Sequence, residues 1–317
     1  MTTMKANRAH PSWLSRFWAI VRYEMLWNIR KKKFIGVIII AFAIATLNVV
    51  FPAIFNISEN PYFAITFSAG NLTFILLSLV TAMNSISGEY ESGTIVPLLT
   101  KPVSRTMVFL GKLFAMFVII FSAYVVIYVY SIIGGIIIYG PQNSLQLVPL
   151  AFIGDMIATF IWVAIVLAAG AISKNSLLAF LMSFGLFVGL VFGGAIVSQF
   201  AANPPALNYF PGTGASGTMD ISGGQNITIQ NVTVNTLASV STGTDSIGTN
   251  LIKAVLYPDA NVSFYSRDVF NLTSVPQLVY TEPISLIALR STGVAFVYIA
   301  VFLSIAWYAF KRSQILE

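Results

Sequence analysis

Cysteine is absent from this chain of 317 residues, and histidine occurs once, as His10. The lack of cysteine excludes disulfides, thiolate metal sites and cysteine nucleophiles. Because His10 lies in a polar N-terminal stretch, we expect neither a histidine metal site nor a catalytic triad. Charge is equally scarce, since charged residues make up 9% of the chain, whereas a typical soluble domain is about a quarter charged. Water alone is therefore not the solvent of this protein.

Apolar residues are correspondingly abundant: they make up 57% of the chain, and the mean hydropathy is +0.83. A helix needs about 20 apolar residues to cross a bilayer core of roughly 30 Å. Six segments meet this length, so the sequence predicts an α-helical integral membrane protein with spans at 34–55, 62–84, 107–139, 147–172, 177–199 and 286–310. The first is too long for the core of a signal peptide. The third exceeds one crossing, and Gly134-Gly135 is a natural place for it to bend.

The basic residues indicate the orientation. Of the 17 Lys and Arg, all but Lys253, Arg267 and Arg290 fall in segments that would lie on one side of the membrane. Positively charged loops stay in the cytoplasm, so we expect a multi-pass protein of the cell membrane with both termini cytoplasmic, including the tail at 311–317. The net charge of +6 then reflects topology, and we expect no binding to nucleic acid.

The region 200–285 differs in composition and is rich in Gly, Ser, Thr and Asn. Between Asn226 and Val234 apolar and polar residues alternate, which is the period of a half-buried strand. We therefore expect a small β-rich extracellular domain between spans five and six. N-glycosylation sequons in the predicted external segments begin at Asn56, Asn226, Asn231, Asn261 and Asn271. A further sequon, at Asn71, lies near the outer end of the second span.

The first 33 residues form a basic and aromatic segment before the first span. At helical spacing Trp13, Phe17, Ile20 and Trp27 fall toward one side, with arginines between them. This pattern favours an amphipathic helix in the headgroup region, with membrane lipid as its partner. A disordered basic leader is the alternative, but it would leave large aromatic side chains in water.

Residues 88–112 read GEYESGTIVPLLTKPVSRTMVFLGK and connect spans two and three on the predicted cytoplasmic side. Ile95, Leu98 and Leu99 make a short apolar face, and Pro102 would end the helix. Glu89 and Glu91 could serve as a general acid and base, but no nucleophile, histidine or metal partner accompanies them. A docking surface is the better interpretation, and no catalytic or metal site is expected.

These residues resemble the first cytoplasmic loop of ABC exporter permeases of the type 2 class. The matching positions are Glu89, Glu91, Gly93, Thr94, Leu98, Leu99, Pro102, Val103, Arg105, Leu110, Gly111 and Lys112. The resemblance implies that residues 88–105 contain a coupling helix, with Glu24 and Arg30 of the N-terminal helix nearby. It also implies three partners or ligands beyond this chain: a separate ABC ATPase subunit, a second permease subunit in a homodimer or heterodimer, and ATP-Mg held by the ATPase. No cofactor is expected on this chain itself.

Two other motif matches lack their structural context. Ile221-Ser-Gly-Gly-Gln is similar to an ATPase signature sequence, and the glycines from Gly212 match a dinucleotide fingerprint. The chain has no phosphate-binding loop of the Gly-x-x-x-x-Gly-Lys type, and both matches lie in the predicted external region. We interpret them as turn glycines, so this chain should not hydrolyse ATP.

Asp155 is an acidic residue well inside an apolar segment. A carboxylate in hydrocarbon costs about 2.5 to 3.5 kcal/mol on insertion scales, so it should face protein, water or a partner such as Arg290. It is either a site on the substrate or proton path or a residue close to the headgroups. Glycines at 185, 189, 193 and 194 predict close helix packing, within the subunit or across a dimer. A secondary transporter and a membrane-anchored receptor with an external binding domain remain the alternative functions.

Overall fold

The structure is a computed structural model that describes residues 12–30, 32–54, 60–94, 104–200, 204–219, 226–229, 232–235, 239–266 and 277–312. Within these residues, six helical segments are long and apolar enough to cross a membrane. They are α2 (Lys33–Ile54), α4 with α5 (Gly70–Ala82 and Ser87–Glu91), α7 (Arg105–Tyr139), α8 (Val148–Ser173), α9 (Ser176–Phe200) and α11 (Ile284–Arg312). The prediction of a mostly helical protein with six segments that could each cross a membrane is confirmed.

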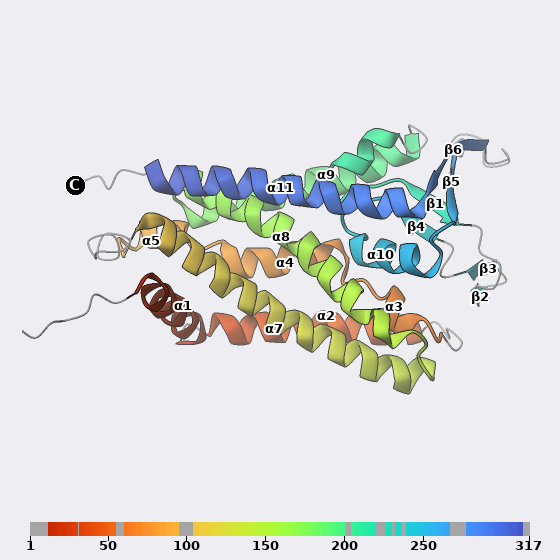
Figure 1. Cartoon of the computed structure of the whole chain (residues 1–317), viewed down its shortest axis with the longest axis horizontal. Coiled ribbons are helices and arrows are strands. Elements are labelled where there is room, and N and C mark those ends of the chain that lie inside the picture. Colours follow the sequence, from red (N-terminus) through yellow and green to blue (C-terminus); the bar gives the residue numbers. More distant parts are fainter. Residues whose placement is uncertain are drawn as a thin grey trace, which may run out of the picture.

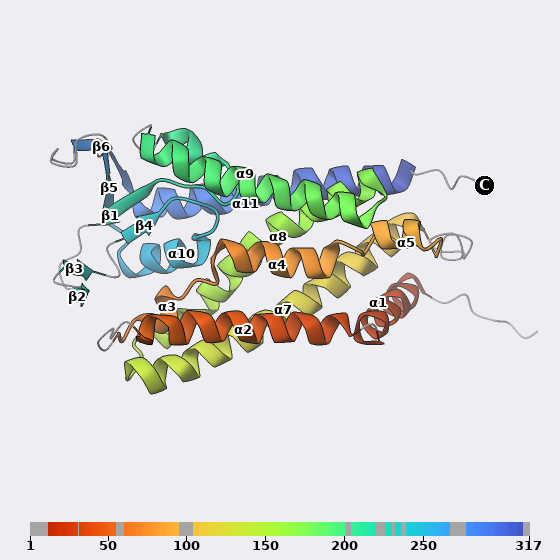
Figure 2. The same cartoon turned by 180° about the vertical axis from the view of Figure 1, so that it is seen from behind.

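Helix α8 occupies the centre of the bundle, where it packs against α4, α9 and α11 (Figures 1 and 2). Small residues along α8 allow neighbouring backbones to approach closely. At Gly154 the approach is extreme, because a Cβ atom there would lie 2.2 Å from the backbone nitrogen of Gly248. Gly248 belongs to α10 (Ile247–Leu256), so this helix is pressed directly onto the central span.

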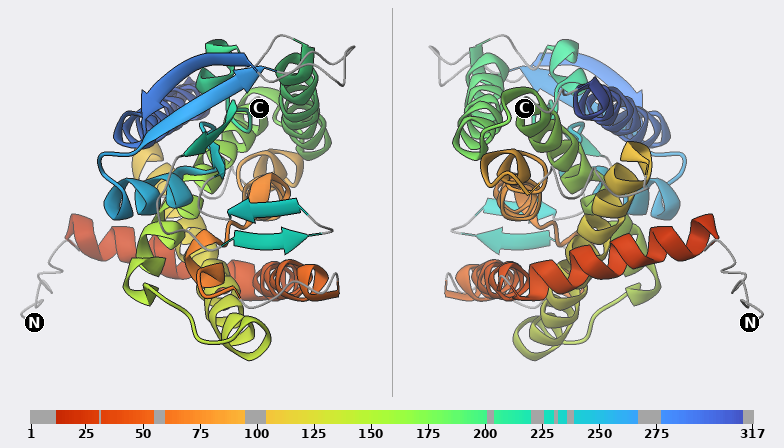
Figure 3. Two further views of the ribbon diagram at one scale, coloured as in Figure 1. Left: turned by 90° about the vertical axis from the view of Figure 1, so that its right-hand side faces the viewer. Right: turned by 90° about the vertical axis from the view of Figure 1, so that its left-hand side faces the viewer.

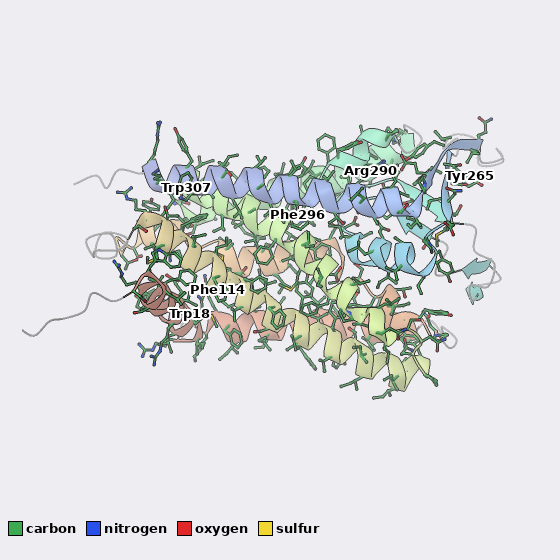
Figure 4. All side chains as sticks on the ribbon, viewed as in Figure 1. Trp18, Phe114, Tyr265, Arg290, Phe296 and Trp307 are labelled. Carbon is green, nitrogen blue, oxygen red and sulfur yellow. The ribbon has the colours of Figure 1, made fainter. Side chains whose placement is uncertain are left out.

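Helix α1 (Trp13–Arg30) lies across the ends of the other helices instead of parallel to them (Figure 3). It packs against the first turns of α7, where the rings of Trp18 and Phe114 meet edge to face with centroids 5.6 Å apart (Figure 4). Trp13 and Tyr23 of this helix are exposed. The helix predicted within the first 33 residues is therefore present, and its location at a membrane surface stays a prediction.

The second span is interrupted, which the sequence-based expectation of one helix over 62–84 missed. A short helix α3 (Phe63–Thr66) ends at Phe67, and α4 begins only at Gly70. Gly70 has a positive φ of 78°, a conformation that costs glycine little. The backbone N–H of Ala69 donates to the Asp155 carboxylate at 3.0 Å. A carboxylate on another helix thus replaces the hydrogen bond that a continuous helix would have supplied.

Helix α7 continues through Gly134 and Gly135 as one helix of 35 residues. It begins at the N-cap Ser104, whose side chain accepts from the Met107 backbone N–H. The two glycines serve packing: a Cβ on Gly134 would lie 2.6 Å from a methyl group of Val49 on α2. The glycine pair therefore allows a close contact between helices, and the helix runs on past it.

The segment between α9 and α11 contains a small antiparallel sheet, as predicted. Its four strands have the order β4-β1-β5-β6, and β2 and β3 form a separate antiparallel pair. The bounds are β1 (Ser216–Met219), β2 (Asn226–Ile229), β3 (Val232–Asn235), β4 (Ser239–Ser241), β5 (Asn261–Ser266) and β6 (Gln277–Pro283). The alternating stretch expected as one strand is thus divided into β2 and β3, paired with Asn226 opposite Asn235.

The sheet and α10 lie at one end of the bundle, whereas α1, α5 and the C-terminal end of α11 lie at the other (Figure 1). Two short 3-10 helices, η1 (Leu145–Leu147) and η2 (Pro205–Tyr209), lie at the same end as the sheet, where η1 precedes α8 and η2 precedes β1. The core of the sheet is apolar and includes Met219, Val262, Phe264 and Ile287. We call these two ends the sheet end and the α5 end.

Candidate functional site

A buried ion network lies at the α5 end. The Lys112 ammonium group on α7 contacts the carboxylate of Glu24 on α1 at 2.7 Å and that of Glu89 on α5 at 2.6 Å. The exposed fractions of the three side chains are 3%, 7% and 19%. One cation therefore joins three helices, and each carboxylate has the opposite charge that burial requires.

The neighbouring glycine explains how α1 reaches this lysine. A Cβ on Gly111 would lie 2.6 Å from a methyl group of Ile20, so only glycine admits α1 at this distance. Lys112 follows directly and meets Glu24, which lies one helical turn after Ile20. The Leu-Gly-Lys sequence that contributes to the family resemblance thus has two physical roles, close helix contact and charge pairing.

Glu91, two residues after Glu89, binds a different helix. Its carboxylate accepts hydrogen bonds from the Ser176 backbone N–H at 2.9 Å and from the Ser176 hydroxyl at 2.7 Å. Ser176 is the first residue of α9, and its hydroxyl also lies 3.1 Å from that of Ser87. Glu89 and Glu91 were predicted to dock a partner protein, but the structure engages both carboxylates within the chain.

The remaining predicted docking residues are only partly described. Gly93 and Thr94 are exposed, and Gly93 has a φ of 66°, which allows the chain to turn after α5. Arg105 donates to the backbone oxygen of Lys311 at 2.8 Å and so joins α7 to the end of α11. Leu98, Leu99 and Pro102, with most of the expected coupling helix, lie outside the described residues.

A polar cleft lies beside the ion network. It is lined by residues of α1, α2, α5 and α7 and of the end of α4, among them Trp27, Lys33, Asn84, Glu89 and Lys112. This cleft could not be predicted from the sequence, because its lining residues are far apart along the chain. The one available signal was the placement of Glu24 near the loop, which the resemblance implied and the Glu24–Lys112 contact confirms.

Asp155, the predicted intramembrane polar residue, is buried, with an exposed fraction of 2%. Besides the Ala69 N–H, its carboxylate accepts a hydrogen bond from the Tyr128 hydroxyl on α7 at 2.9 Å. The suggested partner Arg290 is wrong, because its guanidinium pairs with both carboxylate oxygens of Glu282 at 2.9 and 2.7 Å. Arg290 lies at the start of α11 near the sheet (Figure 4). Asp155 thus caps the interrupted second span.

A second polar contact joins this break to the segment before α10. The Asn71 side-chain amide donates to the Asp245 carboxylate at 3.2 Å and to the Gly212 backbone oxygen at 3.4 Å. The Ser68 hydroxyl donates to the Asp245 backbone oxygen at 3.5 Å. Burial raises the pKa of Asp245 above its usual value. Gly212 lies in a turn with a φ of 76°, as expected for a turn glycine.

The glycosylation candidates differ in accessibility. Asn261 is exposed at the first position of β5. Asn226 begins β2, and Asn56, Asn231 and Asn271 lie outside the described residues. The sequon at Asn71 is a poor site for glycosylation, since the side-chain amide nitrogen of Asn71 already makes two hydrogen bonds within the chain.

Comparison with known proteins adds two findings. Residues 18–315 match the family described as ABC-2 family transporter protein. A segment of 125 residues is 27% identical to an uncharacterized membrane protein, YdbK, of Bacillus subtilis (strain 168). That alignment covers 38% of this chain and 51% of the relative, so the chain spans about half the length of the curated relative that it matches.

Proposed function

Because the chain belongs to the ABC-2 transporter family, we propose that it is the permease subunit of an ATP-driven exporter. It forms the translocation pathway, while a separate ABC ATPase subunit binds and hydrolyses ATP-Mg. The observation that carries this proposal is the family match together with the position of residues 87–94. These residues lie at the α5 end, where Glu89 binds Lys112 on α7 and Glu91 binds Ser176 on α9, while Lys112 also binds Glu24 on α1. We call residues 88–105 the coupling segment.

The proposed orientation places the α5 end in the cytoplasm and the sheet end outside the cell. It is supported by the concentration of Lys and Arg in segments that would be internal, and by the sequons in segments that would be external. The aromatic and basic side chains of α1 would then lie among the headgroups of the inner leaflet, with lipid phosphates as their partners.

A second subunit, either an identical copy or a relative, completes the pathway. Supporting this, α9 presents Gly185, Gly189 and Gly193, and a Cβ on any of them would meet no atom of this chain within 4 Å. Gly194, by contrast, packs against Thr213. A row of small residues lets a helix from another subunit approach closely, so α9 is the face that we assign to the partner permease.

The experiment is purification of the tagged chain from the cells that make it, followed by a test for an ABC ATPase in the eluate. We expect the ATPase to co-elute with the unmodified chain and to be lost with Leu98→Asp, which places a charge on the predicted apolar docking face. The matched control is Leu278→Asp, since Leu278 is an exposed leucine of β6 at the sheet end. Equal co-elution of the ATPase with both variants would contradict the docking assignment.

Family membership favours this function over the two alternatives. A secondary transporter would move solute in proteoliposomes that contain no nucleotide, and a receptor would bind its partner through the sheet end without transport. For the proposed permease, transport requires ATP and the ATPase subunit together. Solute movement by the purified chain alone would therefore refute the proposal.

A further inference from the structure

Helix α9 has two caps at its N-terminus, and they come from different parts of the chain. The first is local: Asn175 accepts a hydrogen bond from the Leu178 backbone N–H at 2.9 Å. The second is Glu91, which is 85 residues away in sequence and accepts from both donors of Ser176. The local cap satisfies one of the four N–H groups that a helix leaves unpaired at its N-terminus, and Glu91 satisfies another. Because Glu91 comes from a distant part of the chain, its bonds also link α9 to the coupling segment.

The chemistry of this link makes it short and directional. Hydrogen bonds to an ionised carboxylate are shorter and stronger than bonds between neutral groups. A negative charge at the first turn of a helix is also favoured by the helix dipole. Two bonds to one residue fix the carboxylate in position as well as in distance, so a displacement of Glu91 is passed to Ser176.

The burial of the spans indicates which helix can respond. Of the most apolar window of each span, 72% is buried for α8 but only 11% for α9. Within its own chain, α9 therefore has far fewer contacts than α8, and much of its remaining surface is the face that we assign to the partner permease. A displacement of its first residue would move α9 relative to α8 and carry that face with it.

We infer that Glu91 is the positioning residue through which the coupling segment moves α9, whereas Glu89 holds the same segment to Lys112 on α7. Glu89 thus connects the loop to a part of the bundle that stays fixed, and Glu91 connects the same loop to a part that can move. This inference rests on the proposed function, because the movement originates in an ATPase bound to the coupling segment.

The absence of cysteine makes a site-specific distance measurement straightforward. Spin labels are placed at Ile137→Cys on α7 and Ile196→Cys on α9, both exposed positions late in their helices. In the complex with the ATPase, the distance between the labels is measured without nucleotide and after trapping with Mg-ATP and vanadate. We expect the trapped state to change this distance in the otherwise unmodified chain.

The Glu91→Ala variant should lose most of the nucleotide-dependent change in distance, because both hydrogen bonds of the link are removed. Ser176→Ala removes one of the two hydrogen bonds and should give an intermediate value. ATP hydrolysis and co-elution of the ATPase should be retained in both variants. The matched control is Asn175→Ala, which weakens the same helix terminus without touching the link and should leave the change intact.

A full distance change in Glu91→Ala would overturn the inference, as would an equal loss in Asn175→Ala, since the effect would then come from general destabilisation of α9. Loss of the ATPase from the Glu91→Ala complex would also overturn it, because Glu91 would then be a docking residue. No change on trapping in the otherwise unmodified chain would refute the proposed function, and the inference with it.

Discussion

The two ends of the bundle hold their buried carboxylates in different ways. At the α5 end, Glu24 and Glu89 share the cation of Lys112. Near the sheet end, Asp155 and Asp245 accept hydrogen bonds from an alcohol, an amide and backbone N–H groups, which are neutral donors. The first arrangement balances charge with charge, and the second relies on dipoles.

This difference indicates which substitutions each end of the bundle can tolerate. An ion network among three helices depends on all of its charges, because removal of one partner leaves the others buried without compensation. A carboxylate held by several neutral donors depends on each hydrogen bond separately, so the loss of one donor removes only the contribution of that donor. The α5 end therefore tolerates the loss of a single charged group poorly, whereas the sheet end tolerates the loss of a single donor better.

The largest effect that tests this comparison is expected from Lys112→Met. Removing the cation leaves two buried carboxylates without compensation, which typically costs about 3 to 5 kcal/mol. We expect a large fall in the free energy of unfolding, measured in detergent by thermal unfolding followed by size-exclusion chromatography.

The control is the triple variant Glu24→Gln, Lys112→Met and Glu89→Gln, which removes all three charges together. Most of the stability should return, because neutral groups of similar size do not require a counter-charge. If Lys112→Met alone were as stable as the unmodified chain, the network would not be a charge-balanced connection.

The next effect concerns the break in the second span. Asp155→Leu leaves the Ala69 N–H and the Tyr128 hydroxyl without their acceptor, and each buried unsatisfied group costs about 1 to 3 kcal/mol. We expect a loss of about 3 kcal/mol in the same unfolding measurement. Tyr128→Phe removes one donor and should cost less than half as much. Equal losses for the two variants would contradict the assignment of Asp155 as the cap of α4.

The smallest effect concerns Lys253, which is buried on α10 and donates to the backbone oxygen of Ser239. Burial lowers the pKa of Lys253 to about 8. In the unfolded chain the pKa of a lysine is about 10.4. Between about pH 8 and this value, the unfolded state binds more protons than the folded state, so the free energy of unfolding rises with pH across that window. We expect the free energy of local opening of α10 to increase by about 1 to 2 kcal/mol from pH 7.5 to 9.5. This quantity is measured by hydrogen exchange, with the observed rates corrected for the intrinsic exchange rate at each pH.

The Lys253→Met variant carries no titrating group at this position, so its opening free energy should not change over the same range. A rise of equal size in the variant would assign the effect to another group. A fall with pH in the unmodified chain would show that the buried amine is held in its charged form.

Much of the fold was predictable because the length and hydropathy of a span are local properties. The bounds of α2, α8, α9 and α11 differ from the predicted spans by two residues or fewer, since each apolar run is ended by polar residues. The role of residues 88–105 in coupling rests on a short motif and stays a prediction. The interruption of the second span was not predictable, because residues 67–69 read Phe-Ser-Ala, which a helix also accepts, and no proline lies among them.

The sequence by itself determined that this is a multi-pass membrane protein of a transporter family, with a sheet-containing segment between its last two spans. Only the tertiary structure decided which groups the rare charges meet: Asp155 meets Ala69 and Tyr128, Glu89 meets Lys112, and Glu91 meets Ser176. The reason is that hydropathy is summed along the chain, whereas a buried charge is satisfied by whichever polar group packing brings beside it. For Asp155 and Ala69 that group lies 86 residues away.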